Sequence, residues 1–541
     1  MVAYRSVFRA ALLGRPTRLI SDGAENAAPR RRNCLVERRR LVLTDKATYV
    51  LSDRGQFVTD GSAAATTPGD MDDAFARFKQ QRDDALNAGK TPPAFVLFFH
   101  GGLVSQDSFL NDATDLVSPY TAAGAGYPYF FVWRSGLGET IMDWVHDKLG
   151  GVMTNQKVTA AVLAANDESE KPENAAQLQP VPTFMELTAS HKPLASPSDD
   201  SALMTQLTAR YRTMPEAQNL QHLFDENPHA SPAQPMARAL RTTTAMTDAE
   251  VAGTVRAALA PPAQAAMQQR TFPLPIAIDI PAILAAATIR VIWRNIHHRN
   301  HPGISTMSEE VARGLGIAFI GQKLWSEMKN DCTSAFNATG VGAAFIQRLK
   351  TLANDGRPLR IFLIGHSAGT IYINDFMNAV AASQVPNNVT FDVVFMAAAI
   401  RSDLFSTLLQ APVAARIDHF RSFGLQDPSE QSCGLTEGFA KPIDFLFQAS
   451  LLYVIAGILE PEPQVDVPLA GMDRFIGVNT RFAGEAEDQL IIDYATRARP
   501  SVWSPTNGAP HGYACTARSH GGFPHDPACE DSMETLIQGW V

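Results

Sequence analysis

The sequence predicts an α/β protein built on a doubly wound, mostly parallel sheet. Short, uninterrupted apolar runs recur along the chain, and helix-length segments separate most of them. Such runs are typical of strands in a parallel sheet, because these strands are buried on both faces. Their alternation with helices indicates crossovers that cover both sides of the sheet.

The first ninety residues are expected to form an N-terminal extension with a hairpin and a helix. Two β-prone runs at 41–52 and 56–59 flank an Asp-Arg-Gly triplet, which favours a hairpin. Residues 70–87 begin with several aspartates, and acidic side chains stabilise the positive end of a helix dipole. The Arg-rich stretch at 29–40 is interpreted as a solvated surface or tail.

Two segments of the chain are expected to share the sheet. Residues 91–140 are the first part of the core, and residues 339–541 are the second part, with the candidate catalytic residues. No clear last strand is found before the C-terminal histidines. The predicted strands lie at 94–100, 128–133, 359–364, 389–396 and 415–423.

Residues 141–338 lie between these parts and are far too long for a simple crossover. They are interpreted as a helical insertion or cap that is partly flexible. The stretch 165–269 is rich in Ala, Pro, Gln and Ser, so it is either loosely packed helix or partly disordered. Amphipathic patterns predict helices at 308–330 and 341–354.

The composition narrows the choice of partners and compartment. The 541 residues carry 46 Lys and Arg against 55 Asp and Glu, a net charge of −9. Nucleic acid is a disfavoured partner, because its phosphates require positive charge. The five cysteines are scattered and form no CxxC pair, and the first residues lack a signal-peptide core, so a cytoplasmic protein is expected.

Two apolar stretches, 276–293 and 443–459, are candidates for membrane spans. Both contain charged or polar residues, and both fall short of the ~20 apolar residues that a span requires. Buried helices are the preferred interpretation, and contact with a membrane interface is the alternative. No stable membrane span is expected.

The clearest chemical motif is GHSAG at 365–369. It follows the strand at 359–364 and precedes a segment whose apolar residues have helical spacing. A strand, a sharp turn and a helix form a nucleophile elbow, in which the turn exposes the serine hydroxyl. Ser367 is therefore the candidate nucleophile, and the two flanking glycines provide room for the turn.

A serine nucleophile also needs hydrogen-bond donors for the oxyanion that forms. The sequence HGGL at 100–103 follows the first buried strand, where backbone amides can approach a substrate. The predicted oxyanion hole consists of amides from Gly102, Leu103 and Ala368. His100 and His366 are interpreted as structural or oxyanion-loop residues.

The general base is expected near the C-terminus. His520 lies in the glycine-flanked sequence SHGGF, and His511 and His525 are alternatives in the same region. Because the base must be neutral to accept a proton, the acylation rate is expected to fall on acidification through roughly pH 6–7.

The acid that orients the base is expected between Ser367 and His520 in the chain, in the order nucleophile, acid, base. Asp427 follows the strand at 415–423 after a short loop and fits best. Asp403 and Glu430 are alternatives, and any of these carboxylates could instead be a surface group or a helix cap.

Taken in chain order, the HGG turn, the GHSAG elbow, Asp427 and the SHGGF loop resemble the α/β-hydrolase superfamily, in particular its lipase- and esterase-like members. The resemblance covers about 94–140 and 340–541. It implies an eight-stranded, mostly parallel sheet with an inserted cap. It also implies a triad of Ser367, Asp427 and His520.

We therefore expect a serine hydrolase that cleaves carboxylic esters through an acyl-enzyme, acts on a small-molecule or lipid-like ester, and needs no cofactor. An amidase, peptidase or acyltransferase would use the same triad, and a catalytically silent hydrolase-fold binding protein is a further alternative. The HHRNH sequence at 297–301 lacks the acidic partner of H-E-x-x-H, so no metal is expected.

Overall fold

The computed structural model describes nine stretches of the chain. They are residues 45–102, 106–121, 124–133, 155–178, 201–226, 279–435, 446–460, 466–476 and 500–540. All of them belong to one compact unit, residues 42–541. The Arg-rich stretch at 29–40 and the oxyanion candidate Leu103 lie outside the described residues, as does much of 165–269.

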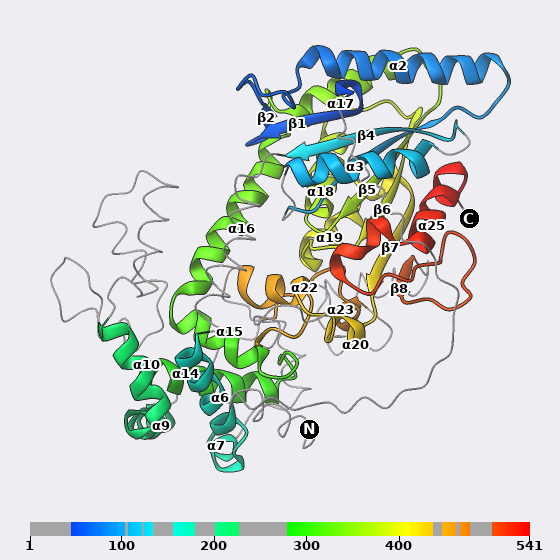
Figure 1. Ribbon diagram of the computed structural model, residues 1–541. Helices are drawn as coiled ribbons and strands as arrows, with labels where there is room; N and C mark the ends of the chain where they lie inside the picture. The colour runs from blue at the N-terminus through cyan, green and yellow to red at the C-terminus, as the bar shows by residue number, and fades with distance from the viewer. Residues whose placement is uncertain are drawn as a thin grey trace, which may run out of the picture. The chain divides into compact units, whose positions relative to one another are not determined.

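Eight strands form a single sheet in the order β2-β1-β4-β3-β5-β6-β7-β8 (Figure 1). Every neighbouring pair is parallel except β1 and β2, which are antiparallel. The predicted α/β class with a mostly parallel sheet is thus confirmed. The strands are β1 (Tyr49–Asp53), β2 (Gln56–Phe57), β3 (Ala94–Phe99), β4 (Gly126–Trp133), β5 (Leu359–His366), β6 (Val389–Met396), β7 (Ile417–Leu425) and β8 (Ser501–Ser504).

Two strands differ from the sequence-based expectation. β1 pairs in parallel with β4, so the predicted hairpin lies in the sheet and not in a separate extension. β8 pairs in parallel with β7 and is the last strand before the C-terminal histidines, where the sequence showed none. Its four residues, between Pro500 and Pro505, are too few to form a recognisable apolar run.

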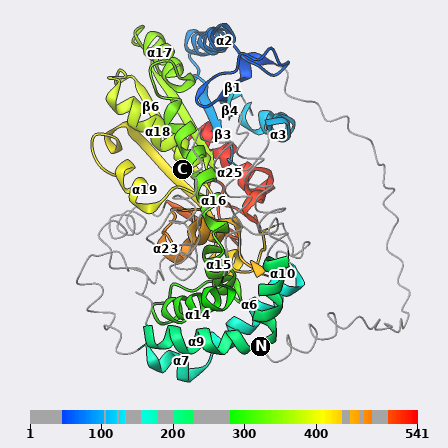
Figure 2. The same cartoon turned by 90° about the vertical axis from the view of Figure 1, so that its left-hand side faces the viewer.

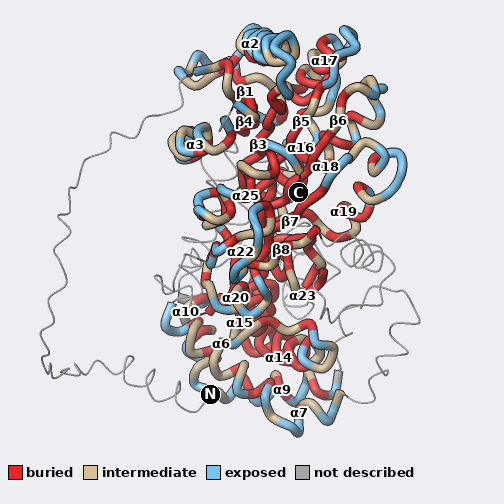
Figure 3. The backbone as a smooth tube through the Cα atoms, turned by 90° about the vertical axis from the view of Figure 1, so that its right-hand side faces the viewer, coloured by how far each residue is buried: buried red, intermediate tan, exposed pale blue. Residues whose placement is uncertain are grey.

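Helices cover both faces of the sheet. On one face, α2 (Pro68–Asn87), α17 (Val341–Ala353) and α18 (Gly369–Ala382) pack on alternate strand residues, and the Phe95 ring lies 5.3 Å from that of Phe75. On the other face, α3 (Gln106–Thr121) and α25 (Pro527–Gln538) pack on the intervening residues, and Phe98 stacks on Phe109. The strands are buried between these layers (Figure 3).

Between β4 and β5 the described chain is helical. The helices before α17 are α6 (Gln156–Ser169), α7 (Pro172–Gln177), α9 (Ser201–Thr213), α10 (Pro215–Glu226), α14 (Ile280–Ile296), α15 (Ser305–Gly314) and α16 (Ile317–Ser334). Helices α6, α9 and α10 contact α14 (Figure 2). The Tyr211 hydroxyl is 2.6 Å from that of Thr288. The described parts of 165–269 are therefore packed helices.

The described residues of the two apolar stretches are mostly buried. Helix α14 is buried along nearly its whole length, and the second stretch contributes α22 (Leu451–Val454) and a π-helical turn, η6 (Ile455–Leu459). Within the residues that the structure describes, no helix combines the length and apolarity needed to cross a membrane.

The helix predicted at 308–330 is in fact two helices. Gly316 has a φ of +73°, which ends α15 and begins α16 in a new direction. Helix α16 then contacts both η6 and α18, so it connects the helices below the sheet with the helix that follows Ser367 (Figure 1).

Candidate active site

The chain turns sharply at Ser367, between the end of β5 and the start of α18. Ser367 has a φ of +51°, a left-handed conformation that is costly for a residue with a side chain. Its amide donates to the Met396 carbonyl at 2.9 Å, and its carbonyl accepts from the Ala399 amide at 3.2 Å. The end of β6 and the segment that follows it therefore hold this strained turn from both sides.

The two glycines of the GHSAG motif are required by close packing. A Cβ at Gly369 would lie 2.0 Å from the Phe99 carbonyl oxygen, and a Cβ at Gly365 would lie 2.8 Å from Ile373 Cδ1. Any side chain at these positions would push α18 away from the sheet. The predicted strand, turn and helix around Ser367 are all present in the structure.

His520 is the histidine that the structure brings to Ser367. It begins a short 3₁₀ helix, η7 (His520–His525), and its Nε2 lies 2.9 Å from Ser367 Oγ. Both side chains are buried, whereas the alternatives His511 and His525 are exposed. A hydroxyl and an imidazole at this distance can exchange a proton.

Burial sets the protonation of this imidazole. Desolvation, followed by the neighbouring imidazole of His366, lowers the pKa of His520 to about 3. His520 is therefore neutral at neutral pH. If Nε2 is to accept the serine proton, the ring's own proton must lie on Nδ1, and Nδ1 has no hydrogen-bond partner among the described residues.

The predicted acid does not reach His520. Asp427 begins the short helix α20 (Asp427–Glu430), and its carboxylate oxygens accept from the Tyr453 hydroxyl and from Gln431 Nε2, each at 2.5 Å. Both oxygens are thus used in other contacts. A triad of Ser367, His520 and Asp427 is not assembled in this structure.

The two alternative acids lie in other surroundings. Asp403 forms an ion pair with Arg401 at 2.6 Å. Glu430 is buried, and desolvation together with nearby Asp427 raises its pKa well above the usual range. Neither residue is hydrogen-bonded to His520 Nδ1.

The predicted oxyanion loop lies against the elbow. A Cβ at Gly101 would be 3.4 Å from Ser367 Cβ, and a Cβ at Gly102 would be 3.1 Å from Ala368 Cβ. The Ala368 amide makes no hydrogen bond within the described part of the chain, and it lies at the N-terminal end of α18, where the helix dipole favours negative charge. The backbone here can therefore accommodate an oxyanion.

The two motif histidines that flank this region are both neutral and buried. His100 Nδ1 donates to its neighbouring carbonyl at 2.7 Å, its Nε2 accepts from the Trp133 amide, and its ring stacks between Phe109 and Trp133. His366 Nε2 donates to the His520 carbonyl at 2.9 Å. Desolvation lowers the pKa of each to about 4. The two histidines are far apart in the sequence, so no local pattern predicts their contact.

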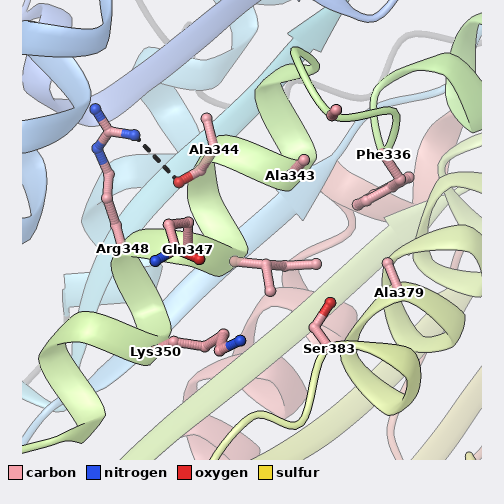
Figure 4. Close-up of a pocket in the computed structure, with 10 residues that line it drawn as sticks. Phe336, Ala343, Ala344, Gln347, Arg348, Lys350, Ala379 and Ser383 are labelled. Atoms are coloured by element: carbon pink, nitrogen blue, oxygen red, sulfur yellow. Dashed lines mark hydrogen bonds between the residues drawn. The ribbon is translucent and has the colours of Figure 1, made fainter.

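The site is covered from the side of α16. A Cβ at Gly102 would lie 2.1 Å from Met328 Sδ, so Met328 packs directly on the turn after β3. A surface groove of about 390 Å³ lies elsewhere, between α17 and the C-terminal half of α18 (Figure 4). There Arg348 donates to the Ala344 carbonyl, and neither Ser367 nor His520 lines the groove.

The histidines of HHRNH form no metal centre in the structure. His301 is buried, with Nδ1 at 2.5 Å from Glu309 Oε1 and Nε2 at 2.8 Å from Asp466 Oδ1. Arg294 and Arg474 bind these same carboxylates, so this is a buried ionic network. No group of three His, Cys, Asp or Glu side chains suited to a metal ion occurs in the described residues.

Comparison of the chain with known proteins identifies no related protein. No family model, curated protein or solved structure matches this chain. Its function is therefore inferred from its own residues.

Proposed function

We propose that the protein is a serine hydrolase that cleaves carboxylic esters through an acyl-enzyme intermediate. The observation that carries the proposal is the 2.9 Å contact between Ser367 Oγ and His520 Nε2, made by a serine on a strained turn between a strand and a helix. The eight-stranded, mostly parallel sheet supports membership of the α/β-hydrolase superfamily, which the sequence motifs resemble.

The proposed reaction follows from the positions of these groups. Ser367 Oγ attacks the ester carbonyl while its proton moves to His520 Nε2. The oxyanion accepts hydrogen bonds from the Ala368 amide and from the turn at Gly102 and Leu103. The His520 proton then passes to the departing alcohol. Water attacks the acyl-enzyme by the same route in reverse and releases the acid.

In this arrangement the Ser367–His520 pair works without a carboxylate on Nδ1. We therefore assign to Asp427 the role that its contacts support, which is to tie α20 to Tyr453. The residues between β4 and β5 would act as a cap, since Met328 of α16 already covers the Gly102 turn. The small number of scattered cysteines supports a reducing, cytoplasmic setting.

A second candidate, a catalytically silent binding protein with a hydrolase-like fold, is favoured by one observation. Nδ1 of His520 is buried and unpartnered among the described residues, so the base lacks the group that most often orients it. An amidase, peptidase or acyltransferase would use the same pair as an esterase, and the choice among these depends on substrate.

Labelling with a fluorophosphonate tests the proposal, because this probe reacts covalently with activated serines. The wild-type protein should be labelled, and the Ser367→Ala variant should not. A wild-type protein that stays unlabelled would support the silent binding protein. A panel of p-nitrophenyl esters and anilides of increasing acyl length would then separate ester from amide cleavage and report the size of the acyl pocket.

A further inference from the structure

His366 lies between the two loops that the proposed reaction uses. Its Nε2 is 2.9 Å from the His520 carbonyl oxygen, and a Cβ at Gly101 would be 3.2 Å from its Nδ1. A carbonyl oxygen can only accept, so Nε2 carries the proton and donates it. The residue before the nucleophile therefore binds the backbone of the base.

The direction of this hydrogen bond is defined because burial determines the protonation state of His366. His366 is buried, and desolvation lowers its pKa to about 4, so it is neutral with one N–H at neutral pH. Its ring centroid lies 5.3 Å from that of His520. The His520 imidazole is itself held only through Nε2 by the described residues. Its orientation therefore depends on the backbone that presents it and on the side chains that pack around the ring.

We propose that His366 is a positioning residue for the base. Its Nε2–H holds the His520 carbonyl, and so fixes the point from which the His520 side chain reaches Ser367 Oγ. The inference rests on the proposed function and adds to it a residue that touches no substrate. Loss of the donor would leave the base free to drift from the hydroxyl, and a misplacement of about 1 Å costs ~100-fold in rate.

Two substitutions of His366 distinguish the effect of its hydrogen bond from the effect of its packing. His366→Phe keeps an aromatic ring but removes the donor, whereas His366→Gln keeps an amide N–H that can donate. His419→Phe is the matched control, since His419 lies in the first half of β7, away from the sheet edge that holds Ser367. Each variant is labelled with the fluorophosphonate probe, and the maximal inactivation rate is separated from the half-saturating concentration.

We expect His366→Phe to lower the maximal rate by ~100-fold with the half-saturating concentration unchanged. His366→Gln should stay within about tenfold of wild type, and His419→Phe should equal it. A wild-type rate in His366→Phe would overturn the inference. So would equal losses in the Phe and Gln variants, because these would indicate a packing role. Failure of the proposed function looks different, since wild type itself would then be unlabelled.

Discussion

Gly369 lies so close to the Phe99 carbonyl that a Cβ at this position would be 2.0 Å from the oxygen. Phe99 ends β3, and Gly369 begins α18, the helix that follows the nucleophile. The closeness of this contact places Ser367 at the end of the central strands. It also explains why the second glycine of the motif is needed, independently of the turn itself.

Gly369→Ala should therefore lower both stability and reactivity. The added methyl group forces α18 away from β3, and overpacking of this kind costs about 1–3 kcal/mol or more in the free energy of unfolding. The change is measured by urea unfolding together with fluorophosphonate labelling. Gly539→Ala is the control, since a Cβ there meets nothing within 4 Å. Equal behaviour of the two variants would contradict the packing argument.

Asp427→Asn should have little effect on the chemistry at Ser367. Its carboxylate contacts Tyr453 and Gln431, not His520, so we expect a labelling rate within about threefold of wild type. If Asp427 were the acid of a triad, the loss would be near 10⁴-fold. A loss of that size would show that Asp427 reaches His520 in the working enzyme.

The pH dependence of labelling reports the state of the base. Burial lowers the pKa of His520 to about 3, so the neutral form persists far below pH 6. The labelling rate should stay within about twofold between pH 8 and pH 5, in contrast to the fall through pH 6–7 that the sequence suggested. Circular dichroism checks that the protein stays folded. A midpoint between pH 6 and 7 would indicate a base that is paired or exposed.

The buried histidines should also make the fold sensitive to acid. Burial lowers the pKa of His100 to about 4, so between about pH 6.5 and pH 4 the unfolded chain binds a proton there that the folded chain does not. The free energy of unfolding therefore falls as the pH falls through this window, by up to about 1.4 kcal/mol per pH unit for each such histidine.

Urea unfolding at pH 7, 6 and 5 measures this slope, and His100→Gln isolates one histidine. The variant should lose stability less steeply than wild type between pH 6 and pH 5, since Gln takes up no proton. Carboxylates with lowered pKa values, such as Glu309, titrate below this range and do not blur the comparison. Parallel curves for the two proteins would mean that His100 takes up its proton equally well in the folded state.

The sequence predicts those features of the fold that are determined by residues close together in the chain. β3 is an unbroken apolar run buried on both faces, so it was recognisable, whereas β8 has four residues and needs its partner β7 to be a strand. The break at Gly316 was hidden because the apolar pattern continues across it. The turn at Ser367 was predicted because its glycines are adjacent in the chain.

Side-chain partners were harder to predict than the elements that hold them. The glycine-flanked loop predicts His520 as the base, and the structure places it beside Ser367. Its place after a strand predicts Asp427 as the acid, but the partner of a carboxylate depends on which side chains pack around it. Tyr453, from a distant segment, decides this contact, and nothing near Asp427 in the sequence indicates it.

The pairing of β3 with β5 has a consequence for how the chain is made. β3 ends at Phe99, and its neighbour begins only at Leu359, so a growing chain must wait for most of its length before this edge can be closed. Until then β3 can pair only with β4, and its other edge stays open as a template for aggregation. Synthesis in the cell should thus depend on chaperones that shield this edge.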